Sequence, residues 1–142
     1  MTRVDFYILP DNEPQARLQF ICRLVEKAYR HNHQVYIHTD NPGESGLIDE
    51  LLWNFRAESF VPHHRLEDGS TTAPVAIGHG ETPGEHHDIL INLSSQVPDF
   101  FSRFERCAEV VVQQQDILAA TRNHFAFYKE RGYPLHTHDL RK

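Results

Sequence analysis

The feature that most constrains this chain is a regular alternation of short strand-forming runs with longer stretches of helical periodicity. The run DILINL at 88–93 is the most apolar of the chain and predicts a buried central strand. Between 18 and 29 the apolar residues follow one face of a helix. This alternation is typical of a three-layer α/β/α fold with a mostly parallel central sheet. We expect strands at 4–9, 34–38, 58–61, 74–77, 88–93 and 109–113, helices at 13–30, 47–55, 98–104 and 116–131, and polar loops at 62–73 and 78–86.

Length and composition fit one domain, 1–142, with little room for a second. Hydrophobic residues make up 39% and charged residues 24% of the chain, a balance that argues against disorder. No run approaches the ~18 apolar residues of a membrane helix. Asp5 stands where a signal peptide needs an apolar run, so we expect a cytoplasmic protein. Cys22 and Cys107 lie far apart in the sequence, which predicts two reduced, packed thiols.

A glycine-rich segment, GHGETPG at 78–84, is similar to a dinucleotide-binding loop at first sight. Its third glycine comes one residue late, and the segment leads into the strand at 88–93 rather than into a helix. A phosphate cradle needs the N–H groups of a helix N-terminus at that place. The first strand-to-helix turn, 10–14, has no glycine and carries two acids, which would repel phosphate. We therefore expect a Rossmann-like fold without a nucleotide-binding motif and without a cofactor.

Eleven histidines suggest a metal site, but their spacing does not support one. The pairs at 63–64 and 86–87, and the residues at 136 and 138, match neither H-E-x-x-H nor a Cys/His zinc pattern. We interpret them as exposed loop histidines and expect no metal. The nucleophile motif G-x-S-x-G does not occur either, so no catalytic residue is predicted.

Charge is unevenly distributed along the chain. The net charge is −6, yet residues 117–142 carry five cations and only two acids, which indicates a local site for an anion rather than a general DNA-binding surface. On a helical projection, Arg122 and Lys129 flank Phe125 and Leu118 at the rim of the buried stripe. The pattern predicts an apolar notch edged by positive charge. The alternative is a pair of cations that extend past core residues into water.

An aromatic cluster at 53–63 has two interpretations. Trp53 projects about 100° beyond Leu52 on the helix, off the apolar stripe, and Phe60 follows in an extended piece. The rings either belong to the core or form an exposed patch for a partner protein, because aromatic residues dominate interface hot spots.

Several of these segments occur together, in this order, in one known family. The chain carries Leu52-Trp53, then ESFVPH at 58–63 and DILINL at 88–93, and finally Arg122, Phe125, Tyr128 and Gly132. Over nearly its whole length it resembles the chi subunits of bacterial DNA polymerase III holoenzyme, and SFVPH is the most specific piece. The resemblance implies a non-catalytic protein–protein adaptor in DNA replication. Such an adaptor joins the psi subunit, and through it the clamp loader complex, to the acidic C-terminal tail of single-stranded DNA-binding protein.

The resemblance also implies which residues bind these partners. One surface would receive psi, or an iron–sulfur helicase in its place, and comprises Trp53, Phe60, Val61 and Pro62. The other would receive the tail and comprises Val111, Leu118, Arg122, Phe125, Lys129 and Thr137. Ala126 and Leu118 stand where the family pattern has basic residues, and Lys129 is the cation that could substitute. No sequence-specific nucleic-acid binding and no membrane contact are implied.

A second class of function stays open at this point. A small nucleotide-binding protein or enzyme of doubly wound fold would share the same alternation of strands and helices. Isothermal titration with ATP, NAD and GTP separates the two hypotheses, because an adaptor should give no heat.

Overall fold

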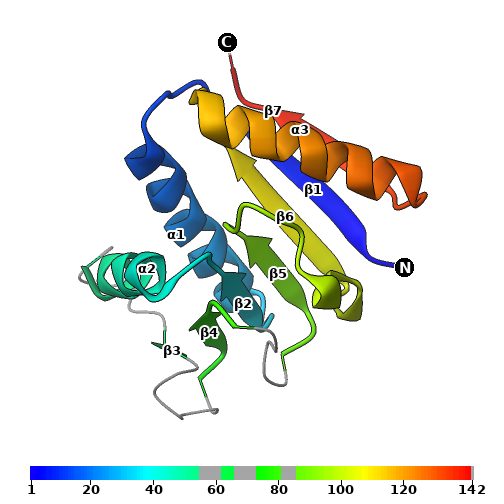
Figure 1. Cartoon of the computed structure of the whole chain (residues 1–142). Helices are drawn as coiled ribbons and strands as arrows, with labels where there is room; N and C mark the ends of the chain where they lie inside the picture. The colour runs from blue at the N-terminus through cyan, green and yellow to red at the C-terminus, as the bar shows by residue number, and fades with distance from the viewer. Residues whose placement is uncertain (55–61, 66–72, 81–85, 142) are drawn as a thin grey trace.

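The computed structural model describes residues 1–54, 62–65, 73–80 and 86–141. Within them, seven strands form one sheet in the order β3-β4-β2-β5-β6-β1-β7, and every neighbouring pair is parallel (Figure 1). The elements are β1 (Arg3–Ile8), α1 (Pro14–Arg30), β2 (Val35–His38), α2 (Pro42–Asn54), β3 (His63–Arg65), β4 (Val75–Gly78), β5 (Ile89–Asn92), the 3-10 helix η2 (Asp99–Arg103), β6 (Arg106–Val111), α3 (Gln115–Glu130) and β7 (Leu135–Asp139).

The helices lie on both faces of the sheet and create two cores. The helices α1 and α2 cover one face, where Ile21, Val25 and Ile48 pack against β2, β4 and β5. On the other face, Tyr128 of α3 and Phe101 of η2 pack against β1, β5 and β6. The three-layer α/β fold with a parallel sheet is therefore confirmed.

The ends of the long helices follow the local sequence. Pro14 begins α1, where its missing N–H group costs no hydrogen bond, and Lys27 and Arg30 occupy the last turn. Beyond α3, Gly132 adopts a φ of +76°, a left-handed conformation that glycine tolerates best, and turns the chain toward β7.

Four segments differ from the sequence-based expectation. The strand β7 was not predicted, because its sequence LHTHD is polar and an edge strand needs only one partner. The strand β3 lies in the predicted polar loop at 62–73, and β6 begins at Arg106, three residues before the expected 109. The helix α2 begins at Pro42, inside the expected turn, where the side chain of Asn41 accepts a hydrogen bond from the Glu44 N–H.

Other expectations are confirmed or fall outside the described residues. Cys22 and Cys107 are buried free thiols, and burial raises the pKa of Cys22 to about 11, which disfavours the reactive thiolate. The extended piece expected at 58–61, which contains Phe60 and Val61, lies outside the described residues. Among the helices that the structure describes, none has the length and apolar character needed to cross a bilayer.

Candidate protein-binding surfaces

A buried ionic network fixes α3 to the sheet. Glu109 of β6 is 1% exposed, and its carboxylate accepts hydrogen bonds from three side chains: His124 Nδ1 (2.9 Å), Tyr128 Oη (2.7 Å) and Asn92 Nδ2 (3.0 Å). The other ring nitrogen of His124, Nε2, lies 2.9 Å from the carbonyl oxygen of Ser95. Because both ring nitrogens face oxygen acceptors, a doubly protonated His124 satisfies both contacts. The network thus pairs an imidazolium with a carboxylate beneath the helix.

The electrostatics of His124 agree with this geometry. Burial lowers the pKa of His124, but the hydrogen bond and the charge of Glu109 outweigh burial, so the net shift is upward. The importance of Glu109 could have been recognised from the sequence. Glu109 stands directly before three valines, and a carboxylate on a strand covered on both faces requires a buried partner.

A second carboxylate, on the opposite face of the sheet, fixes β7. The side chain of Asp5 is 2% exposed, and His138 Nε2 lies 3.0 Å from its Oδ1 atom. Arg3 and Arg106 also contact this carboxylate, each at 3.1 Å. The imidazole of His138 stacks on Tyr7 with 4.6 Å between ring centroids. Burial raises the pKa of Asp5, but the hydrogen bonds from His138 and Arg106 outweigh burial, so its pKa lies below the ordinary value.

The residues predicted to form a notch lie on α3 and β7, the two elements that these networks hold, and at the end of β6. Phe125 is 37% exposed, and its ring centroid lies 5.3 Å from that of Phe6. Thr137 of β7 stands beside Phe6 in the sheet register and faces α3 with it. Arg122 and Lys129 are exposed one turn before and one turn after Phe125. Neither cation forms an ion pair with any residue that the structure describes.

The remaining predicted notch residues occupy different depths. Val111 is buried at the end of β6, beside Ile8, and belongs to the floor beneath the surface. Leu118 is half-buried, and Ala126 is exposed on the outer side of α3. The structure therefore gathers Phe125, Thr137 and the two cations at one edge of α3. We call the surface formed by Leu118, Arg122, Phe125, Lys129 and Thr137 the α3 notch.

The second predicted surface is described only in part. Trp53 is the penultimate residue of α2 and is 60% exposed, whereas Ile48 and Leu52 on the same helix are buried. The core interpretation is therefore wrong for Trp53. The Trp53 ring contacts the His63 ring edge to face, with 5.3 Å between the ring centroids. Pro62, the residue before His63, is half-buried.

Comparison with known proteins identifies the family. The family model described as "DNA polymerase III chi subunit, HolC" matches residues 1–136. The chain belongs to the DNA polymerase III chi subunit family. It is 50% identical over 140 residues to DNA polymerase III subunit chi of Pseudomonas aeruginosa, covering 99% of this chain and 98% of that protein. It is 29% identical over 144 residues to the subunit chi of Escherichia coli (96% and 97%) and 28% identical over 138 residues to that of Haemophilus influenzae (95% and 95%).

Membership of the chi family assigns the chain a role in DNA replication. Chi is an accessory subunit of DNA polymerase III and not a catalytic one, so the chain is not an enzyme in its own right. The surfaces that matter for such a subunit are those that contact other components.

The histidines of this chi-family chain only partly match the expectation of exposed loop residues. His87 and His136 are exposed, as expected. The expectation is wrong for three others, because each is buried or half-buried and has a hydrogen-bond partner in the fold: His63 with Asp49, His86 with the carbonyl oxygen of Ala73, and His138 with Asp5. Within the described ranges, no group of three or more His, Cys, Asp or Glu residues could hold a metal ion.

Proposed function

We propose that this chain is a non-catalytic adaptor of the replisome, acting in the cytoplasm. It joins the clamp loader, through psi, to the acidic C-terminal tail of single-stranded DNA-binding protein. Membership of the chi family supports the replication role. The observation that carries the finer proposal is the α3 notch, where two cations without an ion-pair partner among the described residues flank the half-exposed ring of Phe125.

Each notch residue has a chemical role in this proposal. Arg122 holds the terminal carboxylate of the tail, because a planar guanidinium can donate to both carboxylate oxygens. Lys129 attracts the acidic residues that precede the terminus. Phe125 and Leu118 receive an apolar side chain above the buried Val111, and the hydroxyl of Thr137 is available to a peptide amide or carbonyl group.

The expected strength of this interaction is modest. Burying one aromatic side chain of the peptide offers ~1.5–3 kcal/mol before ordering costs. The rim charges contribute less individually, and salt screens them with a Debye length of ~8 Å at physiological ionic strength. Binding should therefore weaken with salt and depend on a free C-terminus.

The test is a titration of a fluorescent acidic peptide with an apolar C-terminal residue. We expect Arg122→Ala to lose most of the binding and Ala126→Lys to strengthen it, because the latter adds a cation one position beyond Phe125. Equal binding by the wild type and Arg122→Ala would refute the assignment. Unchanged binding affinity after removal of the last residue of the peptide would also refute the assignment.

The Trp53 surface is the proposed site for psi, or for an iron–sulfur helicase in its place. Its supporting observation is the exposure of a large aromatic side chain at the end of α2. Truncating a hot-spot aromatic residue costs about 2 kcal/mol of binding, roughly a 30-fold loss. We expect that loss for Trp53→Ala and for Phe60→Ala with purified psi, while tail binding stays intact. Unchanged psi affinity in both variants would remove the assignment.

A further inference from the structure

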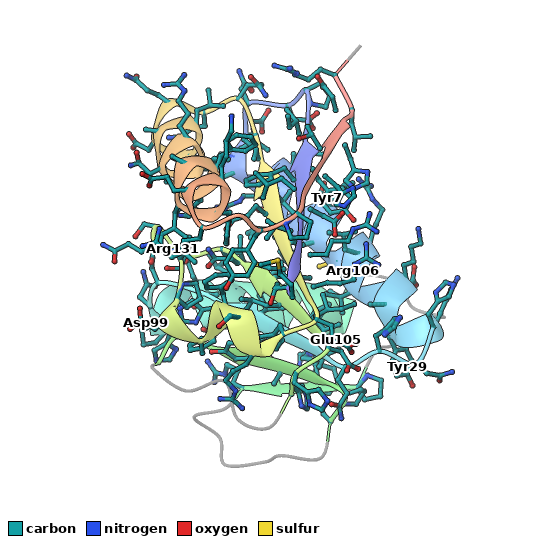
Figure 2. The ribbon with its side chains drawn as sticks, turned by 90° about the vertical axis from the view of Figure 1, so that its right-hand side faces the viewer. Tyr7, Tyr29, Asp99, Glu105, Arg106 and Arg131 are labelled. Atoms are coloured by element: carbon teal, nitrogen blue, oxygen red, sulfur yellow. The ribbon has the colours of Figure 1, made fainter. Side chains whose placement is uncertain are left out.

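A cavity of about 560 Å³ opens on the face of the sheet opposite the α3 notch. It lies between α1 and the strands β1, β5, β6 and β7. Figure 2 shows Tyr7 and Arg106, two of its lining residues, on the side of β1 and β6 that faces α1. Its volume falls within the range of about 300–1,000 Å³ that is typical of ligand pockets. Its apolar wall consists of Leu24, Ala28, Ile89, Ile91, Ala108 and Leu140. We call this cavity the α1 trough.

Strand alternation separates the trough from the notch. Asp5 and Tyr7 of β1 line the trough, whereas Phe6 between them packs under α3. Successive side chains of a strand point to opposite faces of the sheet. A ligand in the trough therefore touches none of the side chains that form the notch.

The rim of the trough is strongly basic. Arg23 and Lys27 lie one turn apart on α1, both exposed, and neither forms an ion pair with a residue that the structure describes. Arg106 of β6 also lines the trough but pairs with Asp5, and three histidines complete the polar lining: His31, His33 and His138. Asp5 is the one acid among the lining residues, and its carboxylate already accepts hydrogen bonds from its own neighbours. The trough therefore offers positive charge that the fold itself does not neutralise.

The aromatic rings of the trough are engaged by other side chains. One face of Tyr7 is stacked on His138, and Phe20 lies 5.4 Å from Tyr7 between centroids. The guanidinium carbon of Arg23 lies 5.5 Å from the centroid of Phe20. Single-stranded nucleic acid is usually bound by rings whose faces are free to stack on bases. The trough instead presents an aliphatic wall beside cations, which suits an apolar side chain flanked by carboxylates.

We propose that the α1 trough is a second peptide-binding site, which takes an acidic segment of a partner protein. One aliphatic side chain of that segment seats against Ile91, Ala108 and Leu140. Its flanking carboxylates reach Arg23 and Lys27. The hydroxyl of Tyr7, which has no hydrogen-bond partner among the described residues, is available to the peptide backbone. This inference does not rest on the proposed tail site, because it uses other residues on the other face of the sheet.

The test uses a peptide that the α3 notch should not hold. The probe is Asp-Glu-Leu-Asp-Asp, acetylated at its N-terminus and amidated at its C-terminus, so that no terminal carboxylate is present. It is titrated into the ¹⁵N-labelled full chain, and amide shifts report both affinity and location. We expect saturable shifts at Ile91, Ala108 and Leu140. The amide analogue Asn-Gln-Leu-Asn-Asn, blocked in the same way, should bind at least about tenfold more weakly.

Three variants make the test specific, and the first two are matched in charge change. Arg23→Glu combined with Lys27→Glu should weaken the probe about tenfold or more, since two attractions become repulsions. Arg103→Glu combined with Arg131→Glu makes the same charge change at two exposed cations on the opposite face, outside the α3 notch, and should leave affinity unchanged. Leu140→Ser trims an exposed part of the wall and should weaken binding several-fold without disturbing the core.

Four results would overturn the proposal. The first two are the absence of saturable shifts and shifts centred on the α3 notch. The third is equal affinity of the peptide for the wild type and the Arg23/Lys27 variant. The fourth is tighter binding of an oligodeoxythymidine than of the peptide at the same residues. The last result would make the trough a nucleic-acid surface instead.

Discussion

Two histidine–carboxylate pairs hold the two elements that carry the α3 notch, and they differ in how far water reaches them. His124 and Glu109, which hold α3, are both almost fully buried. His138 and Asp5, which hold β7, combine a half-buried ring with a buried carboxylate. A third pair, Arg141 with Asp139 at the end of β7, is exposed on both sides. Similar contacts should therefore contribute unequally to stability, because water competes more as exposure increases.

The largest effect is expected from the deepest pair. Glu109→Ala leaves a buried imidazolium and two buried donors without their acceptor, and losing one partner of a buried pair costs about 3–5 kcal/mol. Urea denaturation followed by circular dichroism measures the loss. The control is Glu105→Ala, an exposed acid just before β6, which should leave the unfolding midpoint unchanged. A loss below about 1 kcal/mol for Glu109→Ala would contradict this assessment.

A smaller effect is expected at the half-buried pair. Asp5→Asn removes the charge that His138, Arg3 and Arg106 contact, and hydrogen bonds to charged groups contribute about 1.5–3 kcal/mol. We therefore expect a loss of about 2 kcal/mol in the same denaturation assay. Hydrogen exchange should accelerate at the amides of β7, Thr137 included, more than at those of β5. Equal exchange in β7 for the variant and the wild type would show that Asp5 does not hold this strand.

The two pairs should respond to pH in opposite directions. The pKa of Asp5 is lowered from 3.8 on folding, so its contribution is present above that value and is lost as pH falls through the lower folded pKa. The pKa of His124 is raised from 6.5, so its contribution is full below that value and is lost as pH rises through the higher folded pKa.

Unfolding free energies measured across a pH series separate the two contributions. Asp5→Asn should flatten the acid limb of the stability curve, and His124→Asn should flatten the neutral-to-alkaline limb. Parallel curves for the wild type and either variant would mean that the substituted group does not titrate as its contacts indicate.

The smallest effect is expected at the exposed pair. The guanidinium of Arg141 donates two hydrogen bonds to Asp139 and its backbone N–H donates a third, but both side chains are open to water. Arg141→Ala should leave the unfolding midpoint unchanged within error, because exposed pairs contribute little. A loss as large as that of Asp5→Asn would show that exposure does not set the ranking of the three pairs.

Local patterns predicted those parts of the fold that depend on one element at a time. Helical periodicity predicted α1 and α3, and the apolar run at 88–93 predicted β5. The juxtaposition of Arg122, Phe125 and Lys129 was predictable for the same reason, since all three lie on one helix.

Contacts between distant segments were not predictable in this way. His138 lies 133 residues from Asp5 in the sequence, and no local pattern shows that the two meet. The strand β7 was missed because its polar residues gain their structure from β1 alone. Thr137 entered the predicted site only through the family resemblance, and its place beside Phe6 depends on the strand register.

A tail site between α3 and β7 is tested most directly by locating where an acidic peptide with a free, apolar C-terminus binds. Amide shifts of the ¹⁵N-labelled chain provide that location. We expect saturable shifts at Arg122, Phe125 and Thr137, and loss of most of the binding when the C-terminus of the peptide is amidated. Shifts that centre on Trp53, or that persist unchanged after amidation, would contradict a tail site between α3 and β7.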